Sequence, residues 1–204
     1  MTRVTKVVVA LSLVAGALHA QTPVSGQALG AAVRTPVTNL RSGQVTLPSG
    51  GGFVSADVDA LSALEVRVDA LTTMTSGAMD ALASTAQSTA HLENVNVLNG
   101  LITAQTVIAA TSSWVSGAVG RNAEGSSFTN LVVNGMPFGS GDYLPAPNTR
   151  VDLPGVGYAV LNEQIPSGAS GITVNMIHVV LRDALTGITT GEIIVASASS
   201  SVGN

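Results

Sequence analysis

Apolar and polar residues alternate one for one along several stretches of this chain. Between residues 53 and 60, valine and alanine occupy the even positions, whereas serine and aspartate occupy positions 55, 57 and 59. Leucine and valine alternate in the same way with charged residues over 64–69. A period of two is typical of a half-buried β-strand, with one face on a core and the other in water. The pattern therefore predicts a protein of mainly antiparallel strands.

Three pairs of such runs are joined by residues that favour tight turns. Asn-Gly joins 95–98 to 101–104 and 131–133 to 136–138, and Pro-Gly joins 151–153 to 156–161. Asn and Gly accept the positive φ that hairpin turns require, and Pro followed by Gly suits a type II turn. Further strands are expected at 172–181 and 192–198. We predict an all-β fold, either a β-sandwich or a short solenoid-like stack.

One segment does not follow the alternation. Leucine, valine or methionine at positions 64, 68, 71, 74, 79 and 82 can be placed on one helical face, with steps mostly of three or four. Serine, threonine and glycine are frequent there, however, and no pair of caps brackets the segment. We favour strands for 62–70, and 71–90 stays open between strand and a short helix.

The first twenty residues have the layout of a secretory signal peptide. Arg3 and Lys6 give a positive start, an apolar run follows over 7–18, and Ala20 ends it with a small side chain. Cleavage is expected between Ala20 and Gln21. A membrane anchor needs about 20 apolar residues, so this run is too short to be one. We expect a secreted protein, extracellular or loosely associated with a cell surface, with no integral membrane span after signal removal.

We divide the remaining chain into an N-terminal leader at 21–41, one β-rich extracellular domain at 42–200 and a tail at 201–204. Without residues 1–20 the chain has six basic and twelve acidic residues, a net charge of −6, and no lysine. This acidity argues against nucleic acid as a partner. The chain has no cysteine, so disulfides cannot stabilise it outside the cell. Stability must come from burial and backbone pairing.

Few residues suggest catalysis or metal binding. His91 and His178 are far apart and have no nearby ligand pattern. His178 has the same parity as Val174, Met176 and Val180, which favours a hydrogen-bonded histidine on a strand face. A ligand or a catalytic base is the alternative. No G-x-S-x-G turn and no phosphate loop is present, and we predict no cofactor.

Two other features could bind a ligand. Asp57 and Asp59 share a strand face, which favours a solvated surface, with Ca²⁺ binding or glycosidase chemistry as alternatives. Trp114 lies after a strand-like run and is either a core residue or a surface platform for a sugar. The remaining candidates for such platforms are Tyr143 and Tyr158.

Five longer patches together are more specific than these motifs. In chain order they are ENVNVLNGLITA (93–104), SFTNLVVNG (127–135), LPGVG with VLNEQ (153–164), ITVNMIHV (172–179) and GEIIVASA (191–198). They resemble the choice-of-anchor P family of bacterial secreted and surface proteins over roughly 42–200. The resemblance implies a shared extracellular domain, carried with different C-terminal anchors and without an assigned molecular role. This chain ends soon after residue 198 without such an anchor, so we expect release, or retention by association.

The resemblance also selects signature residues whose role is unassigned, namely Asn162, Glu163, Gln164, Asn175 and His178. We expect these residues either to form a site or to cap turns and satisfy buried backbone groups.

We expect a non-enzymatic structural or adhesive role, with no catalytic and no metal-binding residue. A carbohydrate- or calcium-dependent binding module is the alternative. The partners expected are cell-envelope components, glycans or further copies of the chain.

Overall fold

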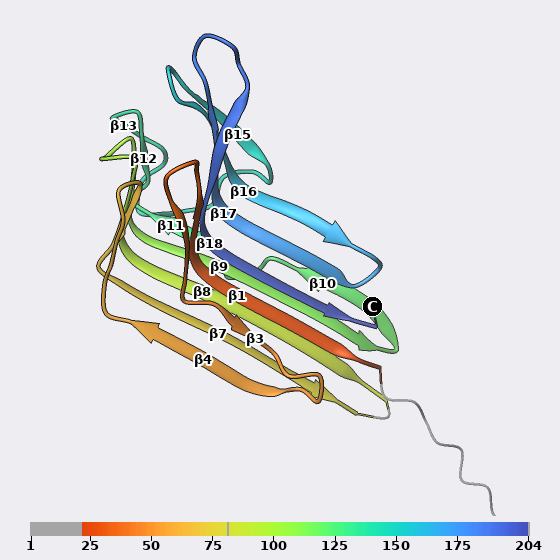
Figure 1. Cartoon of the computed structure of the whole chain (residues 1–204). Coiled ribbons are helices and arrows are strands. Elements are labelled where there is room, and N and C mark those ends of the chain that lie inside the picture. Colours follow the sequence, from red (N-terminus) through yellow and green to blue (C-terminus); the bar gives the residue numbers. More distant parts are fainter. Residues whose placement is uncertain (1–21, 81, 204) are drawn as a thin grey trace, which may run out of the picture.

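The chain folds into two antiparallel β-sheets packed face to face, as the computed structural model in Figure 1 shows for residues 22–80 and 82–203. The predicted all-β fold is therefore confirmed, and of the two arrangements left open it is the β-sandwich. No helix occurs within these two ranges, and so none that could cross a membrane. The predicted signal peptide, with its cleavage position at Ala20 and Gln21, lies outside the described residues.

The first sheet, sheet A, has seven strands in the order β15-β16-β17-β18-β1-β2, and β3 also pairs with β1. Its strands are β1 (Val24–Arg34), β2 (Asn39–Ser42), β3 (Val45–Thr46), β15 (Thr149–Leu153), β16 (Gly157–Ser167), β17 (Gly171–Arg182) and β18 (Thr189–Val202).

The second sheet, sheet B, has eleven strands. They are β4 (Gly52–Val58), β5 (Leu61–Ser62), β6 (Val66–Val68), β7 (Ala70–Met79), β8 (Ser84–Val97), β9 (Ile102–Ser116), β10 (Ala118–Asn122), β11 (Ser127–Thr129), β12 (Val132–Val133), β13 (Met136–Pro137) and β14 (Asp142–Tyr143). The long strands lie in the order β4-β7-β8-β9. Beyond β9 follow the short strands β10, β11 and β12, each paired with a different part of it.

The helix considered for 71–90 does not form, because this segment is the hairpin of β7 and β8. Leu71, Thr73 and Thr75 are buried on one face of β7, whereas Met74 is exposed. Burial thus has a period of two, but two of the three buried side chains are threonines. The alternation was not visible in the sequence because threonines occupy buried positions at which apolar residues are expected.

The three predicted hairpins are confirmed. Asn99 and Gly100 have φ of 54° and 91° in the β8–β9 turn, and Asn134 and Gly135 have 53° and 73° in the β12–β13 turn. Gly155 has φ of 76° between β15 and β16, at the position where a type II turn requires it.

The segment expected to be a leader contains a central strand. β1 lies between β18 on one side and β2 and β3 on the other. Ala28, Leu29 and Ala31 are all buried. Residues 28–31 at the middle of this strand are buried in succession, whereas Ser25, Gln27 and Arg34 are exposed, so the sequence shows no simple apolar–polar period.

An interruption crosses the middle of sheet A. The β16–β17 ladder passes from the pair Leu161–Ile177 to the pair Glu163–Asn175, and Asn162 between them has φ of 49°. On β18, the corresponding residue Ala196 has φ of 53°. We call the line through Asn162, Met176, Ala196 and Gly30 the interruption row. The strands of sheet A bend midway along their length (Figure 1).

The interruption row corrects one sequence prediction. Met176 and Ile177 are both buried, so the alternation along β17 shifts by one residue. Val174 faces the core, whereas His178 and Val180 are only half-buried and face outward. The alternation in the sequence had predicted that His178 shares a face with Val174 and Met176. The structure shows that it does not.

The interruption row also divides the sandwich into two halves. The terminal half contains the paired ends Val24 and Val202, and the distal half contains the turns of the β8–β9 and β17–β18 hairpins. In the distal half, leucine, isoleucine, valine and phenylalanine dominate the core. Within the described ranges, every buried serine and threonine lies in the terminal half, namely Thr73, Thr75, Ser84, Ser88, Thr111, Ser113, Ser126, Ser170 and Ser200.

Candidate functional site

Three of the five signature residues come together on the outer face of sheet A. Glu163 of β16 lies directly opposite Asn175 of β17, and His178 lies three residues after Asn175 on the same strand. The shift at the interruption row is what turns both β17 side chains to the same face. Glu192 of β18 and Arg34 of β1 extend the group across two more strands. We call these five residues the outer-face cluster.

Glu163 is the centre of the outer-face cluster. Its Oε2 atom accepts a hydrogen bond of 2.7 Å from Nδ2 of Asn175. The same oxygen lies 3.0 Å from Nδ1 of His178, which donates to it because a carboxylate only accepts. The Glu163 and His178 side chains are both mostly covered, with 18% and 19% exposure. This bond fixes the orientation of the imidazole ring.

The second imidazole nitrogen faces the other acidic residue. Nε2 of His178 is buried and has no hydrogen-bond partner, and Oε2 of Glu192 lies 3.9 Å from it. Arg34 donates from Nη1 to the other carboxylate oxygen, Oε1 of Glu192, at 3.0 Å. The ring thus lies between two carboxylates, and a proton on Nε2 would place its positive charge beside Glu192.

These contacts shift the pKa values of the pair in opposite directions. The hydrogen bond to Glu163 raises the pKa of His178 above its usual value, although burial works against this, and both carboxylates add to the rise. The hydrogen bond from His178 lowers the pKa of Glu163, with Asn175 contributing and burial opposing. The charged forms of both groups are therefore favoured together.

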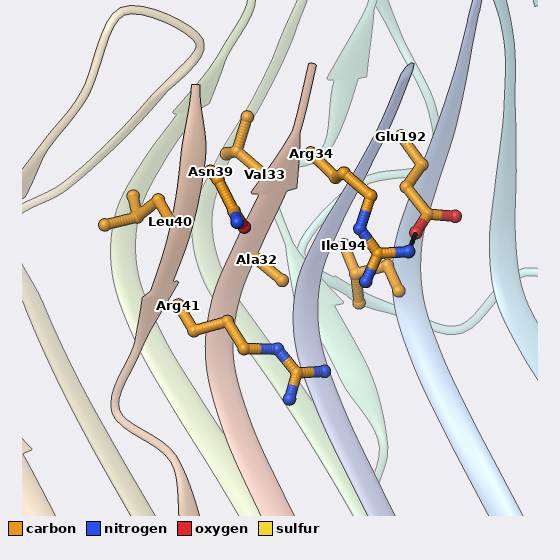
Figure 2. A pocket seen from close by; sticks show the side chains of 8 residues that line it. All are labelled: Ala32, Val33, Arg34, Asn39, Leu40, Arg41, Glu192 and Ile194. Atoms are coloured by element: carbon orange, nitrogen blue, oxygen red, sulfur yellow. Dashed lines mark hydrogen bonds and ion pairs between the residues drawn. The ribbon is translucent and has the colours of Figure 1, made fainter. Parts of the chain in front are cut away.

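Two hollows adjoin the cluster: an open depression of about 310 Å³ lined by Arg34, Thr35 and residues 189–192, and a small one beside Arg41. Figure 2 shows the side chains around the small one, with Arg34 reaching Glu192 and with Arg41 extended over the same face of sheet A. Its volume of about 30 Å³ is enough for about two water molecules. Ligand pockets are typically ten or more times larger.

The geometry resembles part of a hydrolytic site but lacks its nucleophile. In a Ser-His-Asp arrangement, a carboxylate orients one imidazole nitrogen and the other faces a hydroxyl. Here Glu163 occupies the orienting position, but Nε2 faces the carboxylate of Glu192 and has no hydroxyl partner. The chemistry that the arrangement supports is proton uptake by His178 between two acids.

The other two signature residues hold a loop. Asn162 is fully buried, and its Nδ2 donates to the carbonyl of Pro145 at 2.8 Å. Nε2 of Gln164 donates to Oδ1 of Asn162, and the backbone N–H of Gln164 donates to Oδ1 of Asn148. These contacts tie the loop before β15 to β16. The structure thus separates the signature set into a cluster on the surface and a support for backbone groups.

The acidic pair expected on one strand face is divided. Asp57 is exposed on β4, where its Oδ1 accepts a 2.7 Å hydrogen bond from Thr72, whereas Asp59 follows the end of the strand. Among the residues that the structure describes, no group of three or more His, Asp or Glu side chains could hold a metal ion. His91 lies opposite Thr72 on β8 and is half-buried.

The aromatic candidates lie at three separate places. Trp114 faces outward from sheet B opposite Gly120, which leaves room for the indole because a Cβ atom there would overlap it. The Tyr158 ring lies under Arg150, whose Cζ atom is 3.9 Å from the ring centroid. Tyr143 makes an edge contact with Phe138, with the ring centroids 6.2 Å apart.

Arg34, Glu192 and Asn148 were not among the sequence candidates. Arg34 and Glu192 are 158 residues apart and meet because β1 and β18 pair in register. Neither the pairing nor the shift at the interruption row leaves a local signal. Asn148 has a weak one, because asparagine is common where φ is positive, and its φ is 60°.

Comparisons with known proteins give no relative, since no family model, no curated protein and no solved structure matches the chain.

Proposed function

We propose that the protein is a secreted, non-enzymatic structural or adhesive component of a bacterial cell surface. One observation carries the proposal: the hydrogen bonds and ion pairs of the outer-face cluster run between its own members, across four strands. Of the hollows beside the cluster, the one at Arg41 is too small for a substrate, and the wider one at Thr35 and Thr189 is an open surface depression. Such contacts join the neighbouring strands of sheet A and stabilise its outer surface. The signal-peptide layout of residues 1–20 and the resemblance to choice-of-anchor P proteins also support the proposal.

Fractionation of the native cells tests this role, with an intact mass of the protein from each fraction. We expect a chain that begins at Gln21 and carries no covalent anchor, found in the medium or removable from the envelope by high salt. A cytoplasmic chain that retains residues 1–20 would contradict the proposal. Hydrolytic turnover that is lost in both Glu163→Gln and His178→Ala variants would replace it with an enzymatic role.

The second candidate is a carbohydrate-binding module, favoured by the position of Trp114. Its indole faces outward from sheet B between the cross-strand neighbours Thr85 and Gly120. An aromatic face beside hydroxyl groups can pack against a sugar ring. Because the chain has one tryptophan, its fluorescence reports on this position alone. Titration with neutral cell-wall glycans should change the emission if the candidate is correct, and a Trp114→Phe variant should then bind more weakly.

A further inference from the structure

We infer that strand β4 is a self-association edge, at which a second copy of this chain adds its own β4 antiparallel to the first. The inference rests on the proposed structural role and names the partner for it. Among the strands that the structure describes, β4 pairs only with β7, so its other side presents N–H and C=O groups that no described strand binds.

The other edges of the two sheets are short or are interrupted by proline or charge. In sheet A, β15 has five residues with an Arg150–Asp152 ion pair, and β2 has four. In sheet B, β5 and β14 have two residues each, β13 contains Pro137, and β10 has five residues that include the charged Arg121. Such features prevent edge-to-edge pairing in natural proteins.

β4 has fewer of these protections, since its single charged residue, Asp57, lies near one end. It is seven residues long, contains no proline or lysine, and pairs with β7 without a register shift from Gly52 to Val58. Its inward side chains, Val54, Ala56 and Val58, pack against the core but are only half-buried. Its outward Phe53 is 64% exposed. An added strand would cover the apolar row and the ring together.

A pairing centred on Val54 suits a second copy. The two Val54 residues would be opposite each other, and Phe53 would be opposite Ser55 of the second copy. The two Phe53 rings would then be diagonal neighbours, about 7 Å apart at the backbone and within reach of each other. The two Asp57 carboxylates would lie at opposite ends, about 20 Å apart at 3.4 Å per residue. Like charges therefore do not oppose this register.

The expected association is weak. Pairing of two strands of this length buries less than the roughly 800 Å² per partner of a stable complex. A dimer should therefore depend on concentration and form at about 10–100 μM, rather than persist on dilution.

Sedimentation velocity of the secreted chain over a concentration series tests the inference. We expect a shift from the monomer mass to twice that mass. Phe53→Lys should weaken the dimer about tenfold or more, because it places two like charges side by side. Leu185→Lys is the matched control, since Leu185 is 96% exposed in the β17–β18 turn, away from β4. A chain that is monomeric throughout, or a dimer that only Leu185→Lys weakens, would overturn the inference.

Cross-linking locates the contact directly. The chain contains no cysteine, so Ser55→Cys introduces a single thiol at an exposed position. A short bis-maleimide should join two Ser55→Cys chains but not two Leu185→Cys chains. Equal cross-linking of both variants would contradict the assigned edge. Failure here would leave the result of the fractionation experiment unaffected, so the two proposals are tested separately.

Discussion

The two halves of the sandwich achieve a packed interior in different ways. In the distal half, large side chains such as Leu92, Phe128 and Ile177 fill the space between the sheets. In the terminal half, buried hydroxyl groups bond to one another, between Thr75 and Ser88 of neighbouring strands at 2.9 Å and between Ser113 and Ser200 at 2.8 Å. Side chains of this size require the sheets to lie close together. The second contact joins sheet B directly to sheet A.

This difference explains how a chain with 3% aromatic residues builds a core. Where the sheets are close, alanine, serine and threonine fill the interior, and the buried hydroxyls have hydrogen-bond partners except that of Thr111. Where they are further apart, branched aliphatic residues and Phe128 are needed. The outer surfaces differ as well, because the charged outer-face cluster lies across the interruption row, with His178, Glu192 and Arg34 on its distal side, whereas Ser25 and Ser201 bond to each other on the outside of the terminal half.

The largest effect is expected from a cavity in the distal half. Phe128 is fully buried, and Phe128→Ala should lower the free energy of unfolding by about 3–5 kcal/mol. Denaturant unfolding measures this loss. The control is Phe53→Ala, whose ring is 64% exposed and whose loss should be small. Similar losses in both variants would show that Phe128 has no special role in filling this half.

The terminal half should instead be sensitive to added volume. A Cβ atom on Gly26 would overlap Oγ1 of Thr75 and lie 2.9 Å from Oγ of Ser88. Gly26→Ala should therefore cost about 2 kcal/mol, and Thr75→Ala in the same chain should restore part of it. Gly50→Ala is the control, because its Cβ would meet open space. A neutral Gly26→Ala would mean that the sheets are not in close contact here.

Removal of one hydroxyl should have a smaller effect. Ser113 donates to the carbonyl of Ser170 at 2.7 Å, and Ser113→Ala would leave that buried acceptor without this partner. We expect a loss of about 1–2 kcal/mol in the free energy of unfolding. Ser112→Ala, on the outward face of the same strand, should change little. Equal losses would indicate a general effect on β9 rather than the loss of this bond.

The same division explains which parts of the fold the sequence could predict. Alternation was clear over 53–60, where valine and alanine face the core, and the Asn-Gly turns were identified correctly. It was not clear over 71–90, because Thr73 and Thr75 are buried there. The central strand β1 was taken for a leader because residues 28–31 are buried in succession at its middle and interrupt the alternation.

The candidate site was predictable only in part. Glu163, Asn175 and His178 were selected from the sequence, but their contact was not foreseen. It depends on the shift at Met176 and Ile177, which is caused by left-handed residues on the neighbouring strands, including the non-glycine Ala196. Arg34 and Glu192 depend on pairing between the first and last strands. Neither effect can be read from the residues of one strand.

The pair of Glu163 and His178 should add a pH-dependent contribution to stability at the interruption row. The raised pKa of His178 gives stability that is present below about pH 6.5 and is lost as pH rises through the raised value. The lowered pKa of Glu163 gives stability that is present above about pH 4.5 and is lost as pH falls through the lowered value. The contribution of the pair is therefore greatest between about pH 4.5 and 6.5, at about 1 kcal/mol.

Denaturant unfolding from pH 4 to 9 measures this contribution. Glu163→Gln should flatten the decline above pH 6.5, because the neutral amide no longer favours the charged imidazole. Glu124→Gln, at an exposed position in the terminal half, should leave the profile unchanged. An unchanged profile in Glu163→Gln would show that other groups set the pH dependence.

The smallest change in free energy is expected at Arg34, which makes the outermost contact of the outer-face cluster. Its side chain is 72% exposed and that of Glu192 is 39% exposed, so Arg34→Ala should cost no more than about 0.5 kcal/mol. The charge of Glu192 would then act on His178 without a competing cation, and the pKa of His178 should rise further. NMR titration measures this, with His91 on the outer face of sheet B as the internal reference. A loss above about 1 kcal/mol would show that Arg34 itself holds this surface together. An unchanged titration of His178 would show that the cluster is not one coupled group. A rise in the pKa of His178 without a loss of stability would show that Arg34 adjusts the proton affinity of His178, whereas the contact between Glu163 and His178 holds the surface together.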